Sequence, residues 1–155
     1  FSQKTSGYRT MLGVKKFLKW LLIALGLYTI GVFGLESWLD KRISDNPAYE
    51  KSDMVVYRYF TDTDIAGVPK ISERYYFEYH IGDGYAPMNE IIFSDASDLA
   101  PLRDYLKKLG YEKEIKRFGD SEVWKKPAGK SDTFYLWHIK DRNEVRLSKV
   151  FTHIF

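Results

Sequence analysis

Four residues between Asp62 and Glu73 have the spacing of a calcium-binding loop. An EF-hand loop takes acidic ligands at positions 1, 3 and 12 and a glycine at position 6. The chain matches these positions with Asp62, Asp64, Gly67 and Glu73. Position 5, however, is Ala66, which has no side-chain oxygen, and position 9 is Lys70, which adds a positive charge. Because the flanks also read as strands rather than helices, a solvated loop is favoured over a calcium site, and no metal is expected.

The three histidines, His80, His138 and His153, all fall in segments that read as strands. Glu78 and His80 are two residues apart, so a strand places both on one face and allows a carboxylate–imidazole pair. A metal site needs three or four converging ligands, and the spacing supplies only two. We therefore interpret these histidines as structural residues.

Motifs of the common catalytic classes are absent from the sequence. There is no Gly-rich loop before a helix, no Gly-x-Ser-x-Gly and no Ser-x-x-Lys. The chain has no cysteine, which excludes disulfides, thiolate catalysis and cysteine-ligated metals. We expect a protein that is not an enzyme and that needs no cofactor.

The aromatic residues are the stronger functional signal. They make up 17% of the chain, with 12 tyrosines. Tyrosine and tryptophan are common at binding surfaces, although small sheets also use them to fill a core. Tyr76 is the best candidate because it shares the polar face of its segment with Arg74 and Glu78. The expected partner-binding residues are Tyr76, Arg74, Glu78, His80, Tyr85 and Trp137.

An uncharged stretch near the N-terminus has the layout of a membrane anchor. Residues 20–35 carry no charge, and a helix from Trp20 to Trp38 would span about 27 Å, close to a bilayer's hydrocarbon thickness. The two tryptophans would then lie at the membrane interfaces. The anchor residues are expected to be Lys15, Lys16, Lys19, Trp20 and Trp38.

Two other interpretations of this stretch stay open. A cleaved signal peptide would have small residues before its cleavage site, and Val32-Phe33-Gly34 fits that pattern poorly. A buried helix of a soluble domain would show a polar face, and residues 20–35 show none.

The distribution of basic residues predicts the orientation of the anchor. Five of the 24 basic residues lie in residues 1–19, which have no acidic residue. The remainder, with 19 basic and 21 acidic residues, carries a net charge of −2, so nucleic acid is not an expected partner. The positive-inside rule places the N-terminus in the cytoplasm of a bacterium and the rest outside its inner membrane, in the periplasm. Residues 1–10, which precede Met11, are interpreted as an artificial or processed extension.

The remaining residues read as one α+β domain. Strands are expected at 54–60, 71–81, 90–93, 111–118, 122–126, 133–140 and 144–151. A single helix, capped by Asp98 and stopped by Gly110, carries an apolar stripe of Leu99, Leu102, Leu106 and Leu109. The predicted order after the transmembrane helix is β-β-β-α-β-β-β-β, with a mainly antiparallel sheet. The boundaries are 1–10 for the extension, 11–44 for the anchor and 45–155 for the domain.

These features together predict a single-pass membrane protein that acts by binding another protein. The favoured hypothesis is an immunity-type inhibitor that neutralises a toxin from the membrane surface, where anchoring raises its effective concentration. The alternative is an accessory subunit of a larger transport, secretion or envelope-assembly complex. The partners would then be the lipid bilayer and either a toxin or the other subunits of such a complex.

Overall fold

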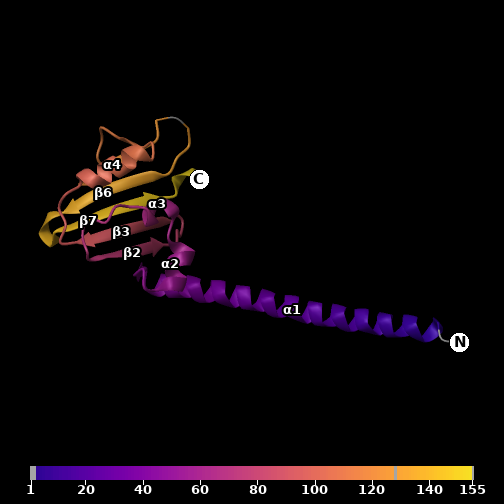
Figure 1. Cartoon of the computed structure of the whole chain (residues 1–155). Helices are drawn as coiled ribbons and strands as arrows, with labels where there is room; N and C mark the ends of the chain where they lie inside the picture. The colour runs from indigo at the N-terminus through magenta and orange to yellow at the C-terminus, as the bar shows by residue number, and fades with distance from the viewer. Residues whose placement is uncertain (1–2, 128, 155) are drawn as a thin grey trace. The chain divides into compact units, whose positions relative to one another are not determined.

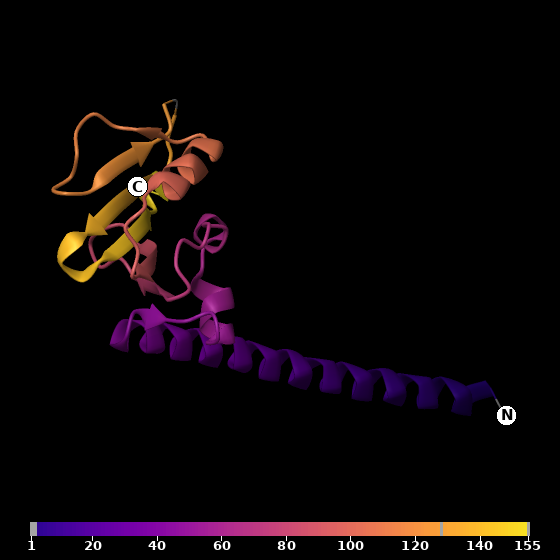
Figure 2. The same cartoon turned by 60° about the vertical axis from the view of Figure 1, so that its left-hand side comes forward.

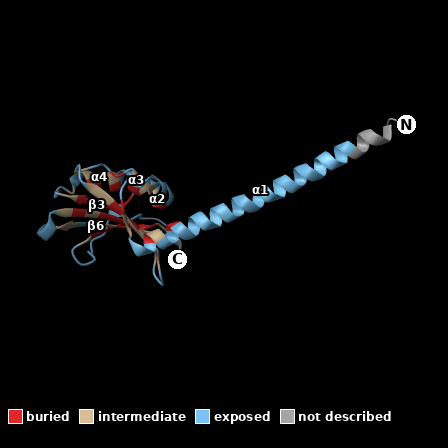
Figure 3. Ribbon diagram, turned by 90° about the horizontal axis from the view of Figure 1, so that it is seen from below, coloured by how far each residue is buried: buried red, intermediate tan, exposed pale blue. Residues whose placement is uncertain are grey.

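The computed structural model describes residues 3–127 and 129–154 and divides into two compact units, 1–41 and 42–155. The first helix, α1 (Gln3–Asp45), forms nearly all of the first unit and ends where Asn46 and Pro47 follow, as the sequence predicts. Within this helix, every residue from 9 to 38 is exposed (Figure 3). Within α1, residues 9–45 are long and apolar enough to span a membrane.

The second unit is built on one antiparallel sheet of seven strands (Figure 1). Its strands lie in the order β1-β2-β3-β7-β6-β5-β4. Their bounds are β1 (Ala48–Tyr49), β2 (Tyr75–His80), β3 (Met88–Ser94), β4 (Glu112–Lys113), β5 (Glu122–Lys125), β6 (Thr133–Ile139) and β7 (Glu144–Val150). The α+β class and the antiparallel sheet are therefore confirmed.

Three helices, α2 (Met54–Phe60), α3 (Thr63–Ala66) and α4 (Ala100–Lys108), lie on one side of this sheet (Figure 2). Short 3-10 turns follow β6 at Lys140–Arg142 and end the described chain at Thr152–Ile154. The core lies between the helices and the sheet, and its residues alternate along each strand. Its fully buried side chains include Ile65, Phe77, Ile91, Phe93, Leu102, Leu106, Trp124, Phe134, Leu136, Val145 and Leu147.

The segment 54–60 corrects the sequence prediction, because it forms α2 and not a strand. Val56 and Phe60, four residues apart, are buried, and the ring of Tyr57 packs edge-on against Phe77 of β2. This tertiary packing selects the helix over the strand preference of a Val- and Tyr-rich segment. The predicted loop after it contains the short helix α3, whose first turn is capped by Asp62 through a 2.9 Å hydrogen bond from the Asp64 amide.

The other differences concern how much of each segment pairs. The predicted strand 71–81 pairs only over β2. The segment 111–118 pairs at β4 and in an isolated bridge at Phe118, while Ile115 between them is wholly exposed. The two-residue strand β1 is absent from the prediction because so short a segment has no visible period. Among its described residues, the domain thus has three α-helices where the sequence predicts one, and its order from β1 is β-α-α-β-β-α-β-β-β-β.

Helix α4 is held on the sheet by apolar and ionic contacts together. Leu102 and Leu106 are 0% exposed, as the predicted stripe requires. Arg103 binds both oxygens of Glu122, a β5 residue that is also 0% exposed. Burial opposes ionisation of Glu122, but the hydrogen bonds and charge of Arg103 outweigh it and lower the pKa of this carboxyl.

We predict that Arg103→Ala lowers the free energy of unfolding by about 2 kcal/mol at pH 7, because it strips a buried carboxylate of its main partner. A folded-state pKa below the unfolded value stabilises the fold above the unfolded pKa, and this contribution disappears as the pH falls through the folded pKa. The gap between the wild type and the variant should therefore narrow below about pH 4. Urea unfolding of the full chain in detergent micelles measures it, with the exposed Lys107→Ala as the control. A gap that does not change with pH would contradict this account.

Candidate functional site

The strands β2, β3, β7 and β6 turn alternate side chains toward the face of the sheet that lies opposite α2, α3 and α4. The register fixes which residues these are, because directly paired residues share a face. We call this surface the open face. It is formed by Tyr76, Glu78, His80, Met88, Glu90, Ile92, Thr133, Tyr135, Trp137, Ile139, Glu144, Arg146, Ser148 and Val150.

Arg146 on the central strand β7 lies among three carboxylates of the open face. Its NH1 atom is 3.7 Å from Glu78 and 3.6 Å from Glu90, and its Nε is 3.8 Å from Glu144. These distances are ion-pair distances but exceed hydrogen-bond length. Both Arg146 Nε and Glu144 Oε2 are buried atoms that have no hydrogen-bond partner among the described residues. The Arg146 cluster is therefore incompletely hydrogen-bonded at Glu144, whose Oε2 also lies 4.0 Å from Arg142.

Glu90 is the most buried member of the Arg146 cluster, at 5% exposure. Its Oε1 accepts a 2.6 Å hydrogen bond from Ser148, and it lies directly opposite Glu78 in the sheet register. Burial raises the pKa of Glu90, and the adjacent Glu78 acts in the same direction, while Ser148 and Arg146 oppose them. The folded domain thus resists ionisation of this carboxyl.

An aromatic side chain lies on each side of the Arg146 cluster. Tyr76, Ile92, Arg146 and Trp137 are successive cross-strand partners and form one row across the open face. Ile92 in this row is 0% exposed, whereas Trp137 is 36% exposed. The row therefore has a buried apolar residue, with the half-buried Tyr76 and Arg146 and the exposed Trp137 beside it, and aromatic residues and arginine are common in binding hot spots.

The structure brings together four of the six expected partner-binding residues, Tyr76, Glu78, His80 and Trp137, on the open face. Arg74 precedes β2 and pairs with Asp95 at 3.0 Å, with both side chains largely exposed. Tyr85 lies in the loop between β2 and β3, where it lines a separate hollow of about 240 Å³ near the end of β2. The expected anchor residues Lys15, Lys16, Lys19, Trp20 and Trp38 are all exposed on α1.

Sequence reasoning missed Glu90, Glu144, Arg146 and Ser148, although all four lie in segments predicted to be strands. The sequence pattern that could have identified three of them is strand alternation, which places Glu144, Arg146 and Ser148 on one face. Only the pairing of β7 with β3 brings them beside Glu78 and His80, and this pairing joins residues more than 50 positions apart.

The calcium-like spacing at Asp62 and Asp64 has a different role. The ammonium of Lys149, on the helix-covered face of β7, lies 2.8 Å from both carboxylates. Burial would lower the pKa of Lys149, but the hydrogen bonds and charges of Asp62 and Asp64 raise it well above its ordinary value. A lysine therefore hydrogen-bonds both aspartates and ties the α3 segment to the sheet.

The other two histidines lie apart from the open face. His153 contacts the carboxylate of Asp132 after the end of β7. His138 lies on the helix side of β6, and its buried Nε2 has no hydrogen-bond partner among the described residues. We assign neither to a site.

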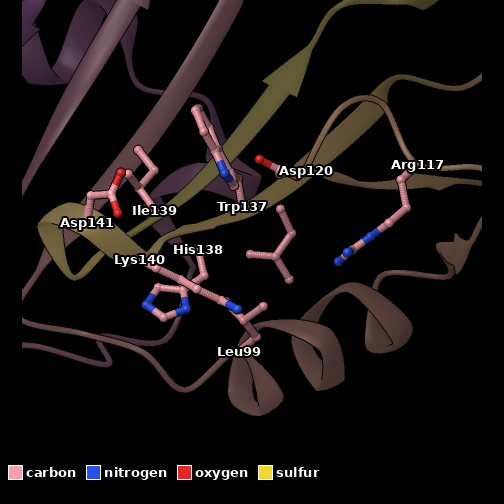
Figure 4. A pocket seen from close by; sticks show the side chains of 9 residues that line it. Leu99, Arg117, Asp120, Trp137, His138, Ile139, Lys140 and Asp141 are labelled. Carbon is pink, nitrogen blue, oxygen red and sulfur yellow. The ribbon is translucent and has the colours of Figure 1, made fainter.

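A cavity of about 520 Å³ lies at the edge of β6 (Figure 4). β5 pairs with β6 only at Phe134–Leu136, so the following residues, 137–139, pair with β7 alone. Arg117 and Asp120 from the connection before β5, together with Leu99, Lys140 and Asp141, line this notch. Trp137 belongs to both the notch and the open face.

We predict that Glu90→Gln stabilises the domain at pH 7 by up to about 1 kcal/mol, because it removes a like-charge pair while it keeps the acceptor for Ser148. A folded-state pKa raised above the unfolded value means that ionisation destabilises the fold, so stability returns as the pH falls through the folded pKa. The advantage of the variant should therefore vanish in acid. Urea midpoints in EDTA-containing buffer test this, with Asp83→Asn in an exposed loop as the control. A less stable variant at pH 7 would refute the like-charge account.

Comparisons with protein-family models, with curated proteins and with solved structures each found no match to this chain.

Proposed function

We propose that this chain is a single-pass membrane protein whose domain binds a protein partner through its open face. The observation that carries the proposal is the open face itself, on which Tyr76, Trp137 and Arg146 surround an apolar centre. Aromatic residues and arginine are the residue types that supply most of the energy at protein interfaces. The helix α1 supports the anchor, because residues 9–38 present apolar side chains that are left exposed.

The favoured form of this function is an immunity-type inhibitor that holds a toxin at the outer surface of the bacterial inner membrane. The mixed charges of the Arg146 cluster support selective binding. Charged groups at an interface reject partners with unmatched charges more strongly than they raise the affinity for the matching partner. Anchoring would supply the inhibitor at high local concentration where a membrane- or wall-directed toxin acts. The orientation proposed for it, with the N-terminus in the cytoplasm, follows from Lys15, Lys16 and Lys19 before the apolar stretch.

The experiment that tests the inhibitor is a toxin-protection assay in the native host. Deletion of the gene should sensitise cells to one secreted protein toxin, and the full chain should restore resistance. A chain whose α1 is replaced by an unrelated membrane span should protect nearly as well, because the anchor only sets location. The chain would instead be an accessory subunit of a membrane complex if it co-purifies with several integral membrane proteins and the chain with the foreign membrane span fails to function.

Single-cysteine labelling tests the proposed membrane topology. The chain has no cysteine of its own, so each introduced cysteine is the single labelling site. Lys130→Cys in the domain should react with a membrane-impermeant maleimide in intact spheroplasts. Gly13→Cys should react only after lysis, because it lies on the cytoplasmic side. The reverse pattern would refute the orientation, and recovery of the chain in the soluble fraction would refute the anchor.

We predict that Tyr76→Ala and Trp137→Ala each weaken binding of the purified partner about 10-fold or more, because each removes a large aromatic contact from the open face. The matched control is Tyr59→Ala, which removes a 51% exposed tyrosine from α2. Titration of the full-chain variants in micelles measures the dissociation constants. Equal affinities for all three variants would exclude the open face as the binding surface.

A further inference from the structure

Three possible metal ligands converge on the open face at one edge of the Arg146 cluster. The imidazole of His80 and the carboxylates of Glu78 and Glu90 each offer one ligand atom, and these atoms all lie within 4.8 Å of one another. Two come from β2 at alternate positions, and the third comes from the directly opposite position of β3. Sequence spacing reveals only the first two, so the third ligand is a product of strand register.

The two distances from the imidazole to the carboxylates are close to those of a tetrahedral site. His80 Nε2 is 3.2 Å from Glu78 Oε2 and 3.6 Å from Glu90 Oε2. Zinc bonds of 2.0–2.1 Å to nitrogen and oxygen at tetrahedral angles require ligand atoms about 3.3 Å apart. Ser148 also fixes the orientation of Glu90, because its hydroxyl donates a hydrogen bond to the other carboxylate oxygen. Metal ligands are commonly held in place by such a second hydrogen bond.

Arg146 competes for the same two carboxylate oxygens, and the structure provides another partner for it. Its NH1 atom faces Glu78 Oε2 and Glu90 Oε2 without reaching hydrogen-bond distance. On its other side, Arg146 Nε and Glu144 Oε2 are both buried, 3.8 Å apart and without a hydrogen bond among the described residues, with Arg142 4.0 Å from the same oxygen of Glu144. A small shift of Arg146 toward Glu144 would complete that hydrogen bond and release the other two carboxylates.

The Lys149 cluster shows a cation that hydrogen-bonds its carboxylates directly in the same domain. There the ammonium makes two 2.8 Å hydrogen bonds to Asp62 and Asp64. No comparable short bond joins Arg146 to Glu78 or Glu90, and His80, with 32% side-chain exposure, can be reached from solvent.

We infer that Glu78, His80 and Glu90 form a binding site for one divalent transition-metal ion, with Zn²⁺ as the ion best suited to one imidazole and two carboxylates. Three protein ligands leave at least one position open for water or for a group from a bound molecule. The site is independent of the partner proposed above, since it rests on ligand geometry alone.

Isothermal titration of the tag-free full chain in micelles with ZnCl₂, after removal of bound metal with EDTA, tests the site. The wild type should bind one zinc ion per chain. His80→Ala should weaken this binding by at least about tenfold, because loss of even an outer-shell partner costs a metal site 10–100-fold. Glu90→Gln should weaken it as well, and urea unfolding in EDTA verifies that this variant is folded.

Two further variants separate metal binding from a structural effect. His138→Ala is the matched control and should bind zinc as the wild type does. Arg146→Gln should bind zinc more tightly, because it removes the competing cation, a gain that damage to the fold would not produce. The inference is overturned if the wild type binds no zinc, if His80→Ala binds as the wild type does, or if His138→Ala loses binding.

Discussion

The pairing of β7 with β3 is the contact on which the domain depends. The strands β1, β2 and β3 form one part of the sheet and β4, β5 and β6 another, and β7 lies between them although it is the last strand in the sequence. It also carries the central cation of each ionic cluster, Lys149 toward the helices and Arg146 toward the open face. Neither cluster can form until the C-terminal strand is in place, which makes the sheet dependent on contacts between distant parts of the chain.

The two clusters contain similar groups but differ in geometry. Each places one basic side chain of β7 near three carboxylates, Asp62, Asp64 and Asp132 for Lys149 and Glu78, Glu90 and Glu144 for Arg146. The first is closed by short hydrogen bonds and ties the α3 segment to the sheet. The second is more open, with longer distances and a raised pKa at Glu90. Structural and candidate functional sites are therefore separated by the two faces of a single strand.

The parts of the fold that local pattern determines could be predicted from the sequence. The end of α1, the stripe of α4 and the hairpin of β6 and β7 follow from periodicity and turn residues. Segment 54–60 could not be predicted, because its β-branched and aromatic residues favour a strand until Tyr57 and Phe60 pack on β2. Part of the candidate site could be predicted from the sequence in the same way. Alternation placed Tyr76, Glu78 and His80 on one face, whereas Glu90 and Arg146 join them only through the strand order.

The end of β6 would have a consequence for the membrane-anchored protein proposed above. Residues 137–139 are unpaired on one side, and an open strand edge is a template for another strand. If the chain is anchored as proposed, its copies move in two dimensions and meet often, so this edge would be under pressure to avoid self-pairing. Arg117, Asp120, Lys140 and Asp141 surround the notch with charges of both signs. Charged side chains beside an unpaired strand edge discourage edge-to-edge pairing, so the notch that leaves residues 137–139 unpaired also protects them.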